Sequence, residues 1–161
     1  MTLEPKPSRA SRVETTHLVM PSDANVLGSA FGGVVMQWTD LAAGMAAMRH
    51  ARLPVVTASI DQLSFLSPVH IGHIAMLRAQ VNAVFGTSME VGVEVTTEDP
   101  TTGEHRLCCD ALLTFVALGP DGRPTAVPPL VPETADDPRR ERAARVRREA
   151  RLAARSPRRT E

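Results

Sequence analysis

The sequence predicts an α+β fold in which one mainly antiparallel sheet wraps around a single long helix. Three observations lead to this prediction: one uninterrupted stretch with helical spacing, strand-like patterns on either side of it, and short turn-rich connections. A helix that is apolar nearly all round must be covered on most sides. One sheet curved around it is the simplest cover, and such a pairing of layers is an α+β arrangement.

The helix is the clearest single element. It is predicted from about Phe31 to Arg52, a stretch without proline in which apolar side chains recur at three- and four-residue steps. The glycines within it each lower helix propensity by about 1 kcal/mol relative to alanine, so tight enclosure by other elements is expected. A short strand over residues 15–20 precedes the helix and ends at Pro21.

Four longer strands are predicted after the helix, over residues 55–66, 74–83, 89–96 and 107–118. The second and third alternate with a period of two, as half-buried strands do. The last is apolar on both faces, which is typical of a central or interface strand. The predicted order is therefore strand, helix and four strands.

The length of 161 residues suits one folded domain, which we place at residues 13–135. Residues 1–12 are polar and contain proline, and we expect them to be disordered. Residues 1–138 carry 8 basic and 15 acidic side chains, a net of −7, whereas residues 139–161 carry 10 Arg and 3 Glu, a net of +7. We expect residues 136–161 to form an Arg-rich tail that is disordered or partly helical. The alternative, a basic surface for nucleic acid, is the less favoured reading.

The sequence also predicts a cytoplasmic protein with no membrane association. No charged and then apolar segment opens the chain, and no apolar run approaches about 18 residues. Cys108 and Cys109 are adjacent, so a disulfide between them would be badly strained, and two lone thiols do not make a metal site. We expect both to be reduced strand residues.

Asp40 is the first candidate for chemistry. It lies inside a helix that exposes little other polar surface, where an aspartate has no capping role and poor propensity. It could lie on a thin solvent stripe with Gln37, or it could face a crevice as a functional carboxylate. The pattern alone leaves both readings open.

Two further candidates surround the predicted start of the helix. The first turn of a helix has unpaired N–H groups and partial positive charge, and Gly32 and Gly33 leave those donors unobstructed. They could hold a carbonyl oxygen and stabilise a developing oxyanion, where one donor is worth about 3 kcal/mol. The alternative is that the glycines serve only close packing. Asn25, in the loop before the helix, could orient water or a carbonyl, or it could only satisfy a turn.

The spacing of these residues predicts a shared site. Asp40 follows Gly33 by seven residues, which is about 10 Å along the helix axis. Both groups then lie too far apart to contact one carbonyl directly. Two antiparallel helices side by side would bring Asp40 of one chain opposite Gly33 and Asn25 of another.

Taken together, residues 15–131 resemble the acyl-CoA hydrolase group of the hotdog superfamily, which includes bacterial broad-specificity acyl-CoA thioesterases and brain-type acyl-CoA hydrolases. The matching motifs are Met20-Pro21-Ser22-Asp23-Ala24-Asn25, Gly28, Phe31-Gly32-Gly33, Asp40-Leu41-Ala42, Val55-Val56-Thr57, Phe65-Leu66-Ser67-Pro68-Val69 with Gly72, and Leu113-Thr114-Phe115-Val116-Ala117-Leu118.

This resemblance implies a hotdog fold, a homodimer that assembles further to a hexamer (a trimer of dimers) or a tetramer, and hydrolysis of acyl-CoA to free acid and CoA. It implies no metal and no cofactor other than the CoA of the substrate. The carried-over site residues are Asp40 as catalytic carboxylate, Asn25 as catalytic amide, Gly33 as backbone donor with Gly32 beside it, and Thr87 and Ser88 near the CoA chain. One departure concerns the two residues before that last pair. Family members commonly have a glycine and a basic residue there, whereas this chain has Phe85-Gly86.

The resulting hypothesis is that Asp40 acts as general base on water or, as the less favoured route, attacks the acyl carbon itself. One alternative is a non-catalytic acyl-CoA-binding module of the same fold, in which the basic tail serves regulation. Another is a hydratase or dehydratase, a chemistry that usually recruits a histidine. None of the five histidines is convincingly placed for that role.

Overall fold

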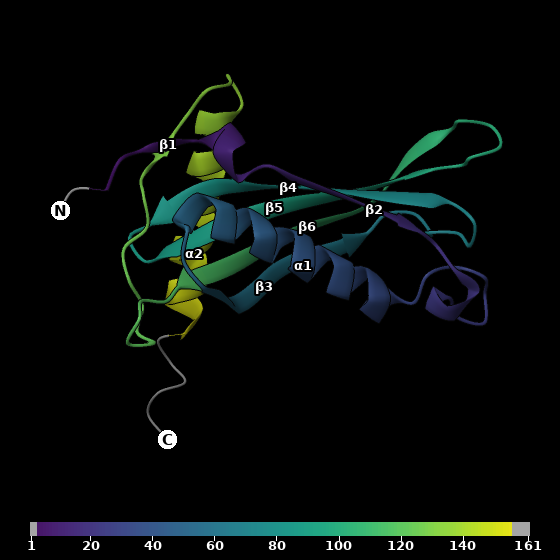
Figure 1. The fold of residues 1–161 in the computed structure, drawn as a ribbon, viewed down its shortest axis with the longest axis horizontal. Coiled ribbons are helices and arrows are strands. Elements are labelled where there is room, and N and C mark those ends of the chain that lie inside the picture. The colour runs from purple at the N-terminus through teal and green to yellow at the C-terminus, as the bar shows by residue number, and fades with distance from the viewer. Residues whose placement is uncertain (1–2, 156–161) are drawn as a thin grey trace.

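The computed structural model describes residues 3–155 and contains one five-stranded sheet with a helix on each face (Figure 1). In chain order the elements are β1 (Lys6–Pro7), the 3-10 helix η1 (Ser8–Ser11), β2 (Val13–Leu18), the 3-10 helix η2 (Pro21–Asp23), α1 (Gly32–Ala51), β3 (Val55–Phe65), β4 (Ile74–Phe85), β5 (Ser88–Glu98), β6 (His105–Ala117), β7 (Leu130–Val131) and α2 (Asp137–Arg155).

The sheet has the strand order β2-β4-β5-β6-β3, and every neighbouring pair is antiparallel. The predicted order of one strand, a helix and four longer strands is therefore present. The first strand begins and ends two residues earlier than predicted. Strand β3 forms one edge of the sheet and pairs only with β6 within the described part of the chain. Its bulges near Ser59 and Asp61 interrupt the register with β6.

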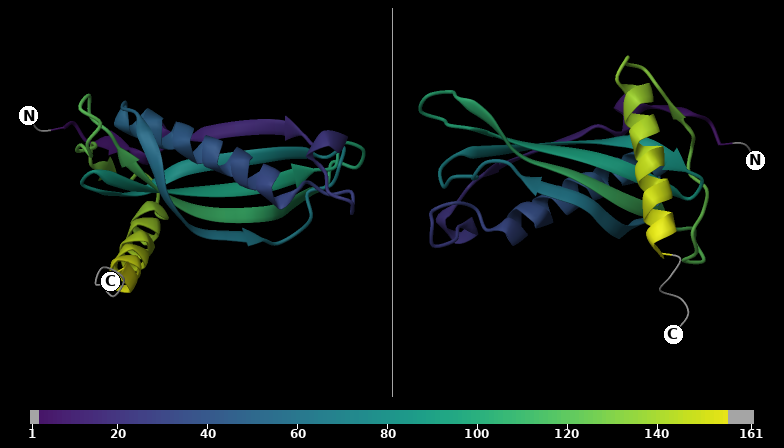
Figure 2. Two further views of the ribbon diagram at one scale, coloured as in Figure 1. Left: turned by 90° about the horizontal axis from the view of Figure 1, so that it is seen from below. Right: turned by 180° about the vertical axis from the view of Figure 1, so that it is seen from behind.

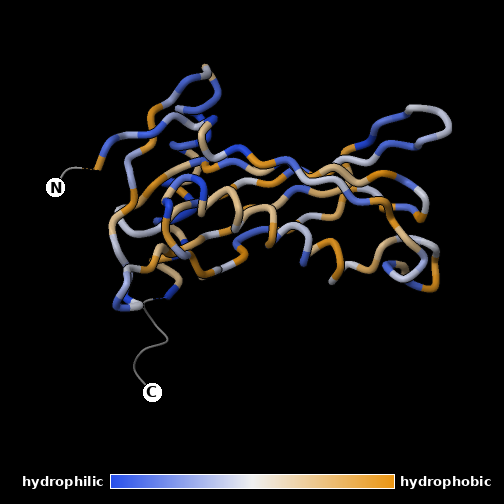
Figure 3. Tube along the Cα trace, viewed as in Figure 1, coloured by the Kyte–Doolittle hydropathy of each residue, from blue (hydrophilic) through white to orange (hydrophobic). Residues whose placement is uncertain are grey.

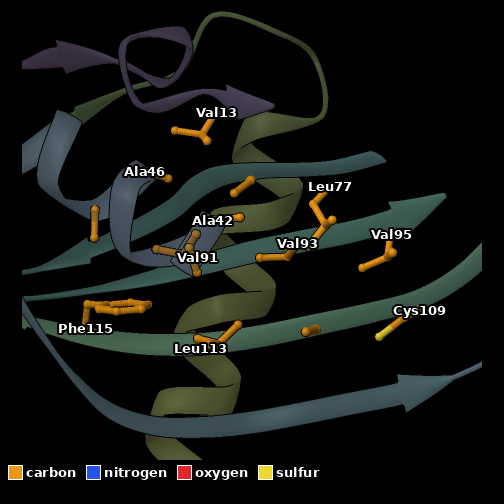
Figure 4. Close-up of a cluster of buried hydrophobic side chains, with 14 of the residues drawn as sticks. Val13, Ala42, Ala46, Leu77, Val91, Val93, Val95, Cys109, Leu113 and Phe115 are labelled. Carbon is orange, nitrogen blue, oxygen red and sulfur yellow. The ribbon is translucent and has the colours of Figure 1, made fainter. Parts of the chain in front are cut away.

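Small residues bring α1 close to the inner face of the sheet. Ala42, Ala43, Ala46 and Ala47 are completely buried, and Figure 4 shows Ala42 and Ala46 among the valines and leucines of the strands. A Cβ added at Gly44 would lie 3.5 Å from the ring of Phe115, which is ordinary contact. The core is thus built from short aliphatic side chains, as expected of a sequence with 3% aromatic residues.

The outer face of the same sheet carries α2, which crosses the strands (Figure 2). Arg147 donates to the two carboxylate oxygens of Glu90 at 3.0 and 2.6 Å, and Arg151 donates to Asp61 at 2.9 Å. Residues 137–155 of the predicted tail are therefore helical and packed on the sheet, not a solvated appendage. Residues 156–161 lie outside the described residues.

Within residues 1–12, which the sequence suggested to be disordered, residues 6–11 form β1 and η1. Ser8 and Ser11 are fully buried. Ser11 accepts a hydrogen bond from the Val81 backbone N–H at 3.0 Å, and Ser8 donates to Asp137 at 2.8 Å. Composition suggested disorder because it does not reveal that these hydroxyls have buried partners.

Candidate active site

Asp40 lies in the middle of α1 and is half-buried beside the edge strand β3. The Thr57 hydroxyl, on β3, donates a 2.8 Å hydrogen bond to Oδ1 of Asp40. The side chain of Asp40 therefore faces the edge of the sheet, where the Thr57 hydroxyl orients its carboxylate, and does not lie on an open solvent stripe. The sequence reasoning named Thr57 only as part of a strand motif and missed this contact. Only the place of Thr57 in that motif could have pointed to it. Periodicity does not predict which strand residue contacts the helix.

The start of α1 is open, as expected of a backbone donor site. The capping residue Phe31 makes no side-chain cap hydrogen bond, and the first turn contains no acidic residue. A Cβ added at Gly32 or Gly33 would come no closer than 3.5 Å to its nearest neighbour. Within this chain neither glycine is required to avoid a clash, and no side chain of its own obstructs the first N–H groups of the helix.

Asn25 lies in the loop that leads into α1 and organises that loop. Its Oδ1 accepts hydrogen bonds from the backbone N–H groups of Leu27 at 2.9 Å and Ser29 at 3.4 Å. Its own backbone N–H donates to Ser29 at 2.8 Å. The side-chain NH₂ group has no acceptor among residues 3–155, so it is available to an external carbonyl or water. The turn role and the functional role are thus compatible, because they use different atoms of the same amide.

Within one protomer the candidate residues do not meet. Strand β4 begins beside the loop that contains Gly28 and ends at the hairpin of Thr87 and Ser88. Twelve residues at about 3.3 Å each separate the two ends by roughly 40 Å. The hairpin therefore lies at the far end of the sheet from Gly33, and Asp40 lies between them on the helix.

The described surface includes a hollow at each of two places that bear on the site. One of about 390 Å³ adjoins the start of α1 and is lined largely by apolar residues, including Val35, Phe65 and Val69. The other, of about 790 Å³, lies between α2 and the outer face of the sheet, away from Asp40, and is lined by charged residues such as Arg78 and Glu94. The smaller hollow is the one beside the backbone donors.

The described residues offer few other candidate groups. Between residues 3 and 155, no three or more His, Cys, Asp or Glu side chains are grouped as metal ligands. Cys108 and Cys109 are buried, and burial raises the pKa of the Cys109 thiol to about 11. Across the same residues, no helix is both long enough and apolar enough to cross a membrane.

Comparison with known proteins places this geometry in a family. A family model described as the thioesterase superfamily matches residues 27–104. Over 129 residues the chain is 41% identical to an uncharacterized acyl-CoA thioester hydrolase of Bacillus subtilis, YkhA, in a match that covers 80% of this chain and 75% of that one. The chain belongs to the family of acyl-CoA thioester hydrolases.

Solved structures of this family confirm the hotdog fold. An apo-hexameric acyl-CoA thioesterase has a TM-score of 0.92 and 38% identity, and the match covers 97% of this chain and all of that one. The acyl-CoA hydrolase of Staphylococcus aureus, in complex with butyryl coenzyme A, coenzyme A and coenzyme A disulfide, has a TM-score of 0.87 and 37% identity over 93% of this chain and 92% of its own. That enzyme has also been solved as separate alanine variants of an asparagine, an aspartate and a threonine.

Proposed function

We propose that this member of the family hydrolyses acyl-CoA to the free carboxylic acid and CoA in a site shared by two protomers, with Asp40 as general base. The observation that carries the proposal is the hydrogen bond from Thr57 to Asp40, which orients a carboxylate at the open edge of the sheet. Neither helix capping nor core packing explains an aspartate at this position in the middle of a mostly buried helix, which favours a functional role for its carboxylate.

The spacing of the substituted residues in the S. aureus enzyme supports the assignment. The separation between its asparagine and its aspartate along the chain equals the separation between Asn25 and Asp40. The separation between its aspartate and its threonine likewise equals the separation between Asp40 and Thr57. The same three residue types at the same spacing argue for the same constellation.

The surface around Asp40 supports a homodimer. Strand β3 offers eleven residues without proline at an edge that no other described strand covers, and such an edge readily pairs with another chain. Exposed apolar side chains lie on this strand, at Val56 and Ile60, and on and just before α1, at Leu41 and Phe31. Figure 3 shows more hydrophobic residues on the loop between β2 and α1. A second copy across this edge would cover them. The hexameric relative supports further assembly to a hexamer, with a tetramer as the alternative.

In such a dimer, the partner's helix start would face Asp40, and each residue would have one task. Asp40 removes a proton from water, and the water oxygen adds to the thioester carbonyl. The Gly33 N–H, with Gly32 beside it, stabilises the resulting oxyanion, and the Asn25 amide orients water or substrate. The carbon–sulfur bond then breaks, and the CoA thiolate takes the proton from Asp40. The hypothesis requires no metal and no cofactor other than the CoA of the substrate.

The test is thiol release from a panel of acyl-CoA thioesters by the wild type and by Asp40→Asn. We expect Asp40→Asn to fold normally and to lose activity by about 10² to 10⁴-fold, the typical contribution of a general base. Gln37→Asn, on the exposed part of the same helix, is the matched control and should keep full activity. Near-normal turnover by Asp40→Asn would refute the assignment, and a fully active monomer would refute the shared site.

A further inference from the structure

The loop that leads into α1 carries two apolar side chains that protrude into solvent. Val26 and Leu27 are more exposed than any other large apolar residue among residues 3–155, and Leu27 is 85% exposed. Residues 24–31 contain no charged side chain. In Figure 1 this loop lies beyond the amino end of α1. Exposed apolar side chains that lie together typically mark a contact with another molecule.

Hydrogen bonds hold this loop in one shape. The Leu27 backbone N–H donates to the side-chain oxygen of Asn25 at 2.9 Å, and the Gly28 N–H donates to the Asn25 carbonyl oxygen at 3.2 Å. Gly28 closes the tip in a left-handed conformation with a φ of 79°, which glycine adopts without strain. Ala24 and Ala30 form an antiparallel bridge at the base. A contact that fixes Leu27 therefore fixes Asn25 as well.

A matching apolar stripe lies on α1, on the carboxyl-terminal side of Asp40. Leu41, Met45 and Met48 follow one another at helical spacing, and each is at least 36% exposed. Residues 41–48 contain no charged side chain. Methionine side chains are flexible and adapt to irregular apolar surfaces. Within residues 3–155, α1 therefore leaves an adaptable apolar stripe, formed by these three residues, open to solvent.

The proposed shared site brings the loop and the apolar stripe together. Where two antiparallel helices place Asp40 opposite the partner's Gly33, the partner's loop, which precedes its helix, continues along the carboxyl-terminal half of this helix. One arm of that loop, residues 28–31, extends roughly 13 Å at about 3.3 Å per residue, which is the length of about nine residues of helix. The tip of the partner's loop therefore reaches as far as Met45 and Met48.

We propose that Val26 and Leu27 form an anchor that each protomer sets against the apolar stripe of its partner. The anchor holds Asn25 and the start of α1 opposite the partner's Asp40, so Leu27 is a positioning residue that touches no reacting atom. This inference rests on the proposed site shared by two protomers. It adds the residues that fix the register of the two helices, and two-fold symmetry makes each contact twice.

Cross-linking tests the contact without any need for activity. Leu27→Cys is combined with Met45→Cys or with Met48→Cys, and covalent dimers are sought on a non-reducing gel after mild oxidation. A disulfide needs Cα atoms within about 7 Å of each other, whereas Gly32 and Met45 are roughly 20 Å apart along α1. A disulfide of either pair can therefore form only between chains. We expect a covalent dimer from at least one pair and from none of the single variants; no covalent dimer from either pair would overturn the anchor.

Mixed dimers test whether the anchor positions the site. A dimer of one Asp40→Asn chain and one Asn25→Ala chain contains one intact site, whose loop comes from the Asp40→Asn chain. We expect Leu27→Ser in that chain to lower kcat about tenfold, since a displacement of about 1 Å can cost about 10²-fold. Leu27→Ser in the Asn25→Ala chain should cost little, because its loop faces the inactive site. Leu27→Met should keep the activity in either chain, as should Val146→Ser, the control at an exposed apolar position of α2.

Equal losses from Leu27→Ser in either chain, or no loss from both, would overturn the positioning role. A loss confined to long acyl chains would show that Leu27 contacts the substrate instead of the partner, and it would also overturn the anchor. The two proposals fail separately. If the wild type hydrolyses no thioester but a cysteine pair forms covalent dimers, the hydrolase proposal fails and the anchor stands. If the wild type is active and neither pair forms covalent dimers, only the anchor fails.

Discussion

The two helices contact opposite faces of one sheet by different physical means. On the inner face, α1 buries four alanines completely, and its attachment depends on apolar area and close packing. On the outer face, α2 buries only Ala144 among its apolar side chains, and it is tied down by Arg147 and Arg151. The hydropathy pattern therefore predicted the first helix well, whereas for the second it predicted only a tail that is disordered or partly helical.

This difference has consequences for function. The inner helix carries Asp40 and Gly33, which as the proposed acid and the proposed backbone donor would have to be held in fixed positions. The outer helix carries eight arginines, of which Arg147 and Arg151 attach it to the sheet. A helix attached through charges keeps a positive surface that an apolar interface would not provide. Substitutions on the two faces of the sheet should therefore differ in their cost and in its dependence on salt.

The largest expected effect on stability is the loss of Arg147. Its partner Glu90 has a side chain that is 2% exposed, and Arg147→Ala would leave that charge with only the Asn82 amide at 3.2 Å. Breaking a buried pair by removing one partner costs about 3 to 5 kcal/mol. We therefore expect the free energy of unfolding, measured by urea denaturation, to fall by about 3 kcal/mol.

Two comparisons sharpen that result. The double variant Glu90→Leu with Arg147→Met should regain most of the loss, because it leaves no buried charge unpaired. Arg139→Ala removes an exposed ion pair with Asp136 on the same helix and should cost less than about 1 kcal/mol. If Arg147→Ala and Arg139→Ala had equal effects, the Glu90 pair would not be what holds α2.

On the inner face, the matching change is Ala46→Leu. Ala46 is completely buried between α1 and the strands, and added methylene groups in a packed core typically cost about 1 to 3 kcal/mol. We expect a loss of about 2 kcal/mol that does not depend on salt concentration. The loss in Arg147→Ala should instead shrink as salt weakens the charge pair in the wild type. Urea denaturation at low and high salt measures both; a salt-dependent cost at Ala46 would contradict the distinction.

The same contrast explains how much the sequence predicted. Apolar side chains recur at helical spacing in α1 and alternate along the half-buried strands, so the order of the elements could be predicted, and Asp40 could be recognised as unusual in a mostly apolar helix. The contact of Thr57 with Asp40 was not, because it depends on how the edge strand meets the helix. The docking of α2 was not predicted either, since nothing local marks Glu90 and Asp61 as its partners. A site that needs a second protomer was inferred only from the distance along one helix.

A smaller effect is expected at Asp137, the first residue of α2. Although burial raises its pKa, hydrogen bonds from the backbone of Glu133 and Thr134 and from Ser8 outweigh burial and hold the pKa well below its usual value. Its contribution is therefore present above the unfolded pKa of about 4 and is lost as the pH falls toward the folded pKa. Asp137→Ala should cost about 1 kcal/mol at pH 7, as lost helix caps do. That cost should diminish in urea denaturation below pH 4; an undiminished cost would contradict the charge-based role.

The smallest effect is expected at His50, where α1 ends against the segment that leads to α2. His50 is fully buried, and its Nε2 lies 2.8 Å from the carbonyl oxygen of Pro128. Burial lowers its pKa, the Pro128 hydrogen bond partly opposes this, and the nearby Lys6 lowers the pKa further. Because the folded pKa lies below the unfolded value of about 6.5, the unfolded chain binds more protons as the pH falls below that value. The wild type should thus lose stability between pH 6.5 and pH 5 in thermal denaturation, and His50→Gln, which has no such titration, should show a flatter profile. Identical pH profiles for the two proteins would show that protonation of His50 does not contribute to the loss of stability at low pH.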